Sequence, residues 1–583
     1  MNKVFNIFAQ CRKELDEFFA DQISIANKQN KNSIRFLSGR DEGYMFNQYN
    51  TINKIEMYYN SQFDSGKYDS DGQRKLFLNV CAFRADVASK QIDIDVKNFV
   101  FIPETGASVW PAYFMQKDFR QWAKDNFFGE VINQVVMDLP KYGTAVLKRV
   151  GDTIERTPLL NLRNKQDAAD LQTADYVIEE HKDMTMQQLS EMEDWDLSEL
   201  DMEFGDKVTV YERYGHVPLS FYKETVLKEK PKEEDYKKSI DTMSIIVFGS
   251  KGMKEASGSL LFMEKIKKRP YEEAHWKRQD GRWMGVGEIE NQFENQMARN
   301  MIANMRRKSL YWSSKKVFYS NSTETPKNLT QEVADGQVLA LGTGGTITPV
   351  DMTSRSIAEF QNTEDVWEKN SDQKSFTFEV ATGEALPSGT PFRLGVVLSN
   401  AVNSHFNLKR EQLGLFFKRV VANQILDIFK RNMSREHVLS VFADEDGFET
   451  LKNVTIEKYS NERAFELMLE GKVVDFAQIR SQVEADIQKR KILFFDIIEN
   501  LYKNVSAKVE IEITGESVDI PKRIETLTNL YNTMSQRQDP RADKVLTAVL
   551  ALSGENVESF GQEAMQSAGQ SALAVPQPQE QTV

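Results

Sequence analysis

The chain has 583 residues, which exceeds one ordinary compact domain and predicts several packed modules. Hydrophobic residues make up 40% and charged residues 28%, and no apolar run reaches the about eighteen residues that a membrane-spanning helix needs. The 74 basic and 87 acidic residues give a net charge of −13, which argues against a protein that grips nucleic-acid phosphates over a large surface. An acidic surface would instead repel a polyanion, which suits a channel that the polyanion passes through rather than a protein that binds it tightly.

The N-terminal residues 1–20 mix charged and apolar side chains and lack the uninterrupted apolar stretch of a signal peptide. We therefore expect a protein made and assembled in the cytoplasm. Cys11 and Cys81 are the two cysteines of the sequence, and neither belongs to a C-x-x-C pair. This usage predicts buried free thiols rather than a disulfide framework or a zinc site.

The region from residue 73 to residue 157 alternates between helical and strand patterns. Apolar residues at helical spacing predict a helix over 73–89, and the alternation that follows predicts a strand over 92–96. A second helix is expected over 114–139, ending at Pro140. A hairpin is expected around the Gly151-Asp152 turn, between strands at 144–149 and 153–157. This part of the chain therefore has an α+β character.

Further strands are expected after residue 175. The run 176–181 is a strand candidate, and Thr185 and Gln188 have the spacing of a helix capping box. Residues 191–206 contain eight acidic side chains, which we interpret as a solvated face rather than a metal site. Short apolar runs at 208–210 and 245–248 predict two more strands.

A long one-sided helix is predicted from Glu288 to Trp312. It would extend about 37 Å at roughly 1.5 Å per residue, and its apolar residues recur at every fourth position. A small β-containing insertion is expected over 313–351, followed by a second long helix over 353–374 that begins at Thr353 and Ser354. Two helices therefore bracket a small β module.

The remaining segments are a loop, helices and a tail. Residues 382–391 are rich in glycine, proline and serine, and a loop of this kind between long helices indicates a functional segment. Helices are predicted over 396–430 and 476–502, a strand over 509–513, and helices again from 521 to about 555, while the final low-complexity residues predict a disordered tail.

No constellation of catalytic residues stands out. The five histidines occur singly, outside any metal-ligand spacing, so we expect no catalytic histidine, metal site or cofactor. Gly249-Ser250-Lys251-Gly252 lacks the spacing of a phosphate-binding loop and is interpreted as a turn. We therefore expect a structural protein and not an enzyme.

The order of these elements resembles the portal proteins of double-stranded DNA phages, the head-to-tail connector family. Two local phrases are also similar to that family: Tyr176-Val177-Ile178-Glu179-Glu180-His181, and Gly281-Arg282-Trp283-Met284-Gly285-Val286-Gly287-Glu288 at the start of the long helix. The resemblance covers roughly residues 40 to 555. It implies a wing (1–287), first stem helix (288–312), clip (313–351), second stem helix (352–375), tunnel loop (376–395), a long helix with the remaining wing (396–520), a helical crown (521–555) and a disordered tail (556–583).

The family resemblance also implies function and partners. A portal forms a ring, usually dodecameric, at one capsid vertex of the virion, and double-stranded DNA passes through it without sequence specificity during packaging and ejection. The clip would bind the large terminase subunit and later head-tail adaptor proteins, and the ring would contact the major capsid and scaffold proteins. No membrane partner is expected.

Three groups of residues are the expected sites. The tunnel loop would face DNA, with Glu384 repelling it and Arg393 contacting phosphate, and the clip would supply terminase or adaptor contacts. An apolar stripe along the stem helices would pack against the neighbouring subunit of the ring. The residues are, for the tunnel loop, Phe378, Thr382, Gly383, Glu384, Pro387 and Arg393; for the clip, Lys315, Lys316, Lys327 and Asn328; and for the stem, Ile289, Phe293, Met297, Met301, Met305, Ile357, Phe360 and Trp367.

Two other interpretations stay open. Another virion structural protein, such as a baseplate, coat or scaffold component, fits the composition but does not predict this order of elements. A nuclease that uses carboxylates is the alternative from a different class, and the sequence offers no paired metal-carboxylate motif with a basic substrate surface. The mass of the purified protein separates a ring from a monomer.

Overall fold

The computed structural model describes residues 5–27, 48–103, 110–248, 258–320, 346–350, 357–377, 392–432, 475–489 and 509–513, with short gaps at 64, 70–71, 199, 201–204, 281 and 315–316, and a few residues within 456–469 and 528–531. The chain divides into two units, 1–513 and 514–583, and the labelled helices and strands all lie in the first. The expected crown lies almost wholly, and the expected tail wholly, outside the described residues.

The fold is α+β, as the sequence predicts. Up to the first stem helix the elements are α1 (Ile7–Asn27), α2 (Gln48–Tyr59), α3 (Cys81–Gln91), η2 (Val96–Asn98), β1 (Phe99–Pro103), α4 (Trp110–Asp125), α5 (Phe128–Tyr142), β2 (Thr144–Val150), β3 (Thr153–Arg156), η3 (Leu159–Asn161), β4 (Leu162–Asn164), β5 (Tyr176–Thr185), α6 (Met186–Ser190), β6 (Lys207–Pro218), α7 (Leu219–Thr225), η4 (Glu233–Tyr236), β7 (Ser239–Phe248), β8 (Gly258–Lys265) and β9 (Tyr271–His275).

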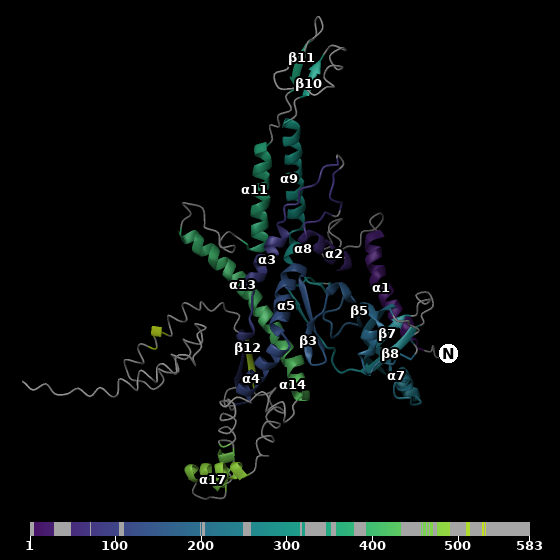
Figure 1. Cartoon of the computed structure of the whole chain (residues 1–583), viewed down its shortest axis with the longest axis vertical. Helices are drawn as coiled ribbons and strands as arrows, with labels where there is room; N and C mark the ends of the chain where they lie inside the picture. The colour runs from purple at the N-terminus through teal and green to yellow at the C-terminus, as the bar shows by residue number, and fades with distance from the viewer. Residues whose placement is uncertain are drawn as a thin grey trace, which may run out of the picture. The chain divides into compact units, whose positions relative to one another are not determined.

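The second half of the unit is mainly helical (Figure 1). Its elements are α8 (Glu288–Asn291), α9 (Phe293–Ser314), β10 (Val317–Ser320), β11 (Ile347–Val350), α11 (Ile357–Ser375), α13 (Phe392–Val420), the π-helical turn η5 (Val421–Ile425), α14 (Leu426–Asn432), α17 (Phe476–Lys489) and β12 (Val509–Ile513). None of the described helices is long and apolar enough to cross a membrane.

The strands form antiparallel sheets. A five-stranded sheet has the order β4-β5-β6-β7-β8, and a three-stranded sheet has the order β3-β2-β9. The hairpin predicted around Gly151-Asp152 is confirmed as β2 and β3, and the strand predicted over 176–181 is confirmed as part of β5. The capping box of Thr185 and Gln188 is also present at the start of α6. The strand predicted over 509–513 is β12, which pairs with β1 from far earlier in the chain.

Both faces of the five-stranded sheet are covered, because alternate residues along its strands point to opposite sides. On one face, α1 and α7 pack over a cluster that includes Ile178, Tyr211 and Ile246. Arg213 on β6 donates to both carboxylate oxygens of Glu14 on α1, each at 2.6 Å, and both side chains are buried. On the other face, residues 195–200 pack over a second cluster.

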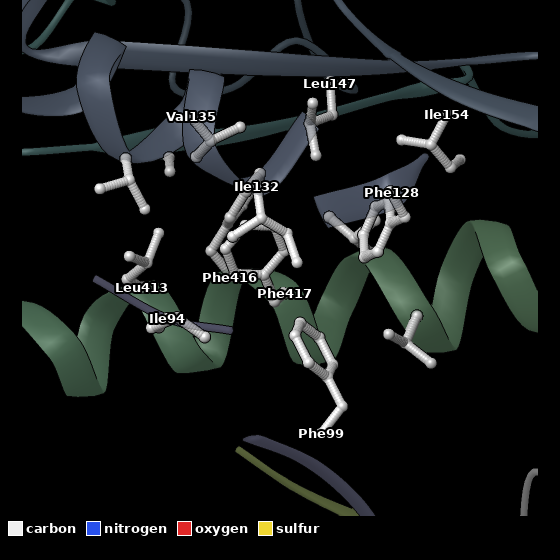
Figure 2. Close-up of a cluster of buried hydrophobic side chains, with 14 of the residues drawn as sticks. Ile94, Phe99, Phe128, Ile132, Val135, Leu147, Ile154, Leu413, Phe416 and Phe417 are labelled. Carbon is white, nitrogen blue, oxygen red and sulfur yellow. The ribbon is translucent and has the colours of Figure 1, made fainter. Parts of the chain in front are cut away.

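The largest core lies between α5, α13 and the strands β1, β2 and β3. Phe416 and Phe417 on α13 meet Ile132 and Val135 on α5, with Phe128 beside them (Figure 2). Phe128, Ile132 and Val135 follow one another at intervals of four and three residues along α5, and Leu413, Phe416, Phe417 and Val420 recur at helical spacing along α13, so each helix presents one continuous apolar face. The helix predicted over 396–430 therefore packs into the same core as the N-terminal α+β region.

The prediction of a helix over 73–89 is wrong in its first half. The helix α3 begins at Cys81, and residues 75–80 before it belong to no helix or strand. Backbone groups of Leu76, Leu78 and Val80 bond to side chains of α9 instead of to each other. Partners distant in the sequence therefore override a local helical pattern.

Two neighbouring predictions also need correction. Residues 92–96 are not a strand: the Asp95 side chain accepts a bond from the Lys97 amide and forms a capping box with Asn98, so the chain turns there, and the strand β1 begins at Phe99. The helix predicted over 114–139 is two helices, α4 and α5, because Phe127 adopts a left-handed conformation with φ of 49°. The second of these continues through Pro140 and ends at Gly143.

Gly143 marks a close backbone crossing. It has φ of 83°, and a Cβ on it would collide with backbone atoms of residues 285–287. Gly285 and Gly287 meet the backbone of 140–143 in the same way. The Gly285-Val286-Gly287 phrase before the first stem helix is therefore required for packing, because a side chain at the crossing would force the two segments apart.

Candidate assembly interface

The helices α9 and α11 form an antiparallel pair (Figure 1). Arg306 pairs with Glu364 at 3.3 Å, and Arg299 pairs with Glu368 at 3.3 Å. Gln292, at the start of α9, donates to the Ser371 carbonyl at 3.1 Å near the end of α11. The residue numbers of the partners on α11 fall as those on α9 rise, so the two helices run in opposite directions.

The first stem helix is broken at Gln292 into α8 and α9, which corrects the single helix predicted from 288.

A second face of α9 holds an extended segment, residues 74–80, which we call the strap. Gln296 accepts bonds from the amides of Val80 (2.8 Å) and Cys81 (3.2 Å) and donates to the Leu78 carbonyl at 2.6 Å. Asn300 accepts from the Leu78 amide at 2.9 Å. Asn304 exchanges two bonds of 2.8 Å with Leu76. Three amide side chains, four residues apart, thus serve as a hydrogen-bonding edge for an extended chain.

A third face of α9 is apolar and exposed. Met297, Met301 and Met305 retain 57%, 56% and 50% of their exposable surface in the single chain. They lie one residue after Gln296, Asn300 and Asn304, so neither the strap nor α11 covers them. We call these three side chains the methionine stripe. Methionine stems and thioethers pack well against irregular partner surfaces, and an uncovered row of them is typical of a contact site.

The other expected stem residues divide between core and surface. Ile289 and Phe293 are buried in a cluster with α2 and α3. Phe360 and Trp367 on α11 are half-buried, and Ile357 begins that helix. The structure therefore brings the methionines together as one stripe and places the first two residues inside the subunit.

Most of the expected clip and tunnel-loop residues lie outside the described part of the chain. These are Lys315, Lys316, Lys327, Asn328, Phe378, Thr382, Gly383, Glu384 and Pro387; Arg393 lies in the first turn of α13, but its side chain is not described. The described part of the insertion is the antiparallel pair β10 and β11, which connects the paired helices. Where the expected tunnel loop begins, Arg84 of α3 pairs with Asp372 and donates to the Thr377 carbonyl at 2.7 Å.

A buried ion cluster joins the two larger sheets. Lys148 on β2 lies 2.7 Å from Glu179 on β5 and also pairs with Glu212 on β6. Tyr271 on β9 donates to Glu179 at 2.7 Å, and a ring nitrogen of His181 lies 3.1 Å from Glu212. No local sequence pattern predicts this cluster, because its four strands meet only in the fold.

Glu179, His181 and Glu212 could in principle hold a cation, because their ligand atoms lie within 4.8 Å of one another. The Lys148 ammonium already supplies a positive charge to both carboxylates. Burial alone would raise the pKa of Glu212, but Lys148, His181 and Tyr214 together lower it to about 2. Burial lowers the pKa of Lys148, and the two carboxylates outweigh burial and raise it. The geometry is that of a satisfied structural network rather than an open metal site.

Comparison with known proteins finds a likeness in structure but none in sequence. No protein-family model matches the sequence, and no curated protein matches it. A solved structure described as "Neck of empty GTA particle computed with C6 symmetry" matches with 8% sequence identity and a TM-score of 0.32, covering 63% of this chain and 86% of that chain. A score of this size does not assign a function, so the function must be argued from the interface itself.

Proposed function

We propose that the chain is a portal-like ring subunit that forms a DNA channel at one vertex of a viral capsid. The observation that carries the proposal is the pair α9 and α11, connected through β10 and β11, with the methionine stripe left uncovered. A row of exposed apolar side chains along a helix is typical of a surface that another protein buries. In a closed ring each subunit supplies that neighbour through a heterologous contact.

The order of the elements supports the same proposal. The α+β body and α13 share one hydrophobic core, and the helical pair leaves that body and returns to it. In this arrangement the body is the wing, α9 and α11 are the stem, and β10 with β11 belongs to the clip, where terminase and adaptor proteins would bind. The net charge of −13 suits a channel that lets DNA slide.

We propose a structural rather than a catalytic role for the buried ion cluster. A metal-dependent nuclease needs carboxylates that are free to coordinate a cation and reach a phosphate. Here both carboxylates are buried and bonded to Lys148, and tyrosine hydroxyls occupy further acceptor positions. The nuclease alternative predicts DNA cleavage with Mg²⁺ that Glu212→Gln abolishes. We expect the purified chain to leave linear DNA intact under these conditions.

The test of the ring is the mass and image of the purified protein. Mass photometry should show a large multiple of the 67.0 kDa chain, and negative-stain images should show closed rings with a central hole. A baseplate, coat or scaffold component would give open sheets, filaments or irregular oligomers instead. A monomer at every salt concentration from low to high would overturn the proposal.

A further inference from the structure

A basic groove of about 840 Å³ lies between α13 and the residues at and after the end of β9. Five cationic side chains line it: Lys277, Arg278, Lys409, Lys418 and Arg419. This concentration of positive charge is unusual in a chain whose net charge is −13. An anionic partner would be attracted to the groove before it touches the rest of the surface.

Three of these cations donate to main-chain carbonyl oxygens, which are neutral, and Arg278 also pairs with Glu273. Lys409 donates to the Trp276 carbonyl, and Arg419 donates to the Glu273 carbonyl at 2.9 Å. Arg278 donates to the Ala169 carbonyl at 3.1 Å. The pKa of Lys409 is lowered, mainly because the side chain is partly buried; Lys277 adds to this effect and Glu288 opposes it.

Glu273 supplies the carboxylate among the residues that line the groove, and the bonds it makes are to groups of the same chain. Glu273 is buried and accepts bonds from the Trp283 indole at 2.7 Å and the Leu171 amide at 3.1 Å. Its other oxygen lies 3.1 Å from His275 and 3.4 Å from Arg278. The residues that line the groove include one carboxylate and five cations, so the lining is positively charged.

The groove also borders a backbone irregularity. Ala422 and Asn423, which line it, belong to the π-helical turn Val421–Ile425 of the helix that follows α13. Turns of this kind are costly in a helix and occur most often at functional sites. Asn423 donates to Glu272 at 2.9 Å, so this turn is tied to β9 across the groove floor.

The same chain carries a matching acidic surface. Residues 191–206, which we call the acidic segment, contain eight acidic and no basic residues, more than half of the net charge of −13. Glu191, Glu193, Asp194, Asp196 and Asp206 are exposed. The Asp196 amide donates to the Leu261 carbonyl of β8 at 2.8 Å, and Trp195 packs against the five-stranded sheet. The segment is therefore fixed to the sheet, and these five acidic side chains are exposed in the single chain.

We propose that the basic groove of one subunit binds the acidic segment of the neighbouring copy. This inference rests on the proposed ring, because a heterologous ring contact joins two different surfaces of the same chain. Acidic subunits repel one another, and local pairing of this kind offsets the repulsion and sets the register of the ring.

A nucleic-acid backbone is the competing occupant, and two observations disfavour it. The chain is acidic overall, and the groove offers five cations in a concave pocket rather than a basic stripe along an exposed face. A protein segment with closely spaced carboxylates fits such a pocket better than a duplex, whose phosphates lie on a wide convex surface.

The test is a charge swap in the full chain. The groove variant is Lys277→Glu/Arg278→Glu, and the segment variant is Glu193→Lys/Asp194→Lys; all four side chains are exposed, so folding should be preserved. Each variant alone should raise the concentration for half-assembly by at least about tenfold, measured by mass photometry. The matched control, Lys230→Glu/Lys237→Glu, changes charge equally on another surface and should assemble like the parent chain.

Combining the two variants, in one chain or as a mixture, is the decisive step. The chain with all four substitutions should regain rings, and so should an equal mixture of the two variants, because alternating subunits then restore complementary charge at every contact. If the parent and both variants form rings equally well, this inference fails while the ring proposal stands. The inference also fails if neither combination of the variants restores rings. It fails too if the groove variant forms normal rings but no longer binds duplex DNA. A parent chain that stays monomeric overturns the ring itself.

Discussion

The buried ion cluster between the two larger sheets and the paired helices α9 and α11 are both rich in polar side chains, but they are satisfied in different ways. In the cluster, Lys148, Glu179 and Glu212 are buried and bonded to one another within one subunit. On α9, Gln296, Asn300 and Asn304 bond to the strap, while the next residue after each of them is a methionine left in solvent. The first region is complete in one chain, whereas the proposed ring would complete the second by covering its methionines.

This difference separates folding from assembly. A buried charge that loses its partner destabilises the subunit itself, because it cannot be rehydrated without opening the core. An exposed apolar side chain contributes little to the free energy of unfolding of one subunit, but it can dominate a contact between subunits. Substitutions in the two regions should therefore change different measurements.

The largest effect on folding is expected from Lys148→Met. The substitution leaves Glu179 and Glu212 buried together without their cation, and should reduce the free energy of unfolding by about 3–5 kcal/mol, measured by urea unfolding. Arg149→Met is the matched control on the same strand. Arg149 pairs with the half-exposed Asp427, so its loss should cost at most about 1 kcal/mol. Equal losses at the two positions would show that the cluster is not a buried network.

A smaller effect of the same network should appear on acidification. The pKa of Glu212 is about 2 in the folded chain and 4.5 in the absence of the fold. Because the folded value is depressed, the stabilisation is complete above pH 4.5 and is lost as the pH falls through about 2. The free energy of unfolding should therefore fall by about 3 kcal/mol more in the parent chain than in Glu212→Gln across this window. Parallel pH profiles would contradict this.

Gln296→Leu should have an intermediate effect on the free energy of unfolding, because it removes bonds that hold the strap. The leucine removes the acceptor for the Val80 and Cys81 amides and the donor to the Leu78 carbonyl, which should cost about 1–3 kcal/mol. Amide hydrogen exchange should accelerate over residues 76–81. The control Gln373→Leu removes an exposed amide from α11 and should leave exchange in the strap unchanged. Exchange that stays slow in the Gln296 variant would show that the strap is held by other contacts.

The sequence predicted the elements whose signals are local. The hairpin at Gly151-Asp152, the capping box of Thr185 and the strand 509–513 depend on turn chemistry, a three-residue spacing and simple alternation, and all are present. The insertion between two long helices is also present as β10 and β11 where it is described.

Several of the failures share a physical cause, which is pairing between distant segments. The strap has helical periodicity, but its backbone bonds to α9 more than 200 residues later. The ion cluster needs four strands whose charged residues look like ordinary strand positions, although a lysine in the apolar run of β2 was an available signal. The methionine stripe was predicted as a set, but Ile289 and Phe293 were grouped with it because the sequence does not show where α3 and α2 pack.

The smallest effect on folding, and a decisive one for assembly, is expected from Met301→Glu. Met301 is 56% exposed, and glutamate is a good helix former, so the free energy of unfolding of the single chain should change by no more than about 0.5 kcal/mol. Ring formation should be lost, because each contact would bury an unpaired carboxylate. Met137→Glu, at a methionine of α5 that is 54% exposed, is the control and should leave rings intact. If Met301→Glu also assembles, the stripe faces solvent in the ring, and the contact between subunits must lie on other surfaces of the chain.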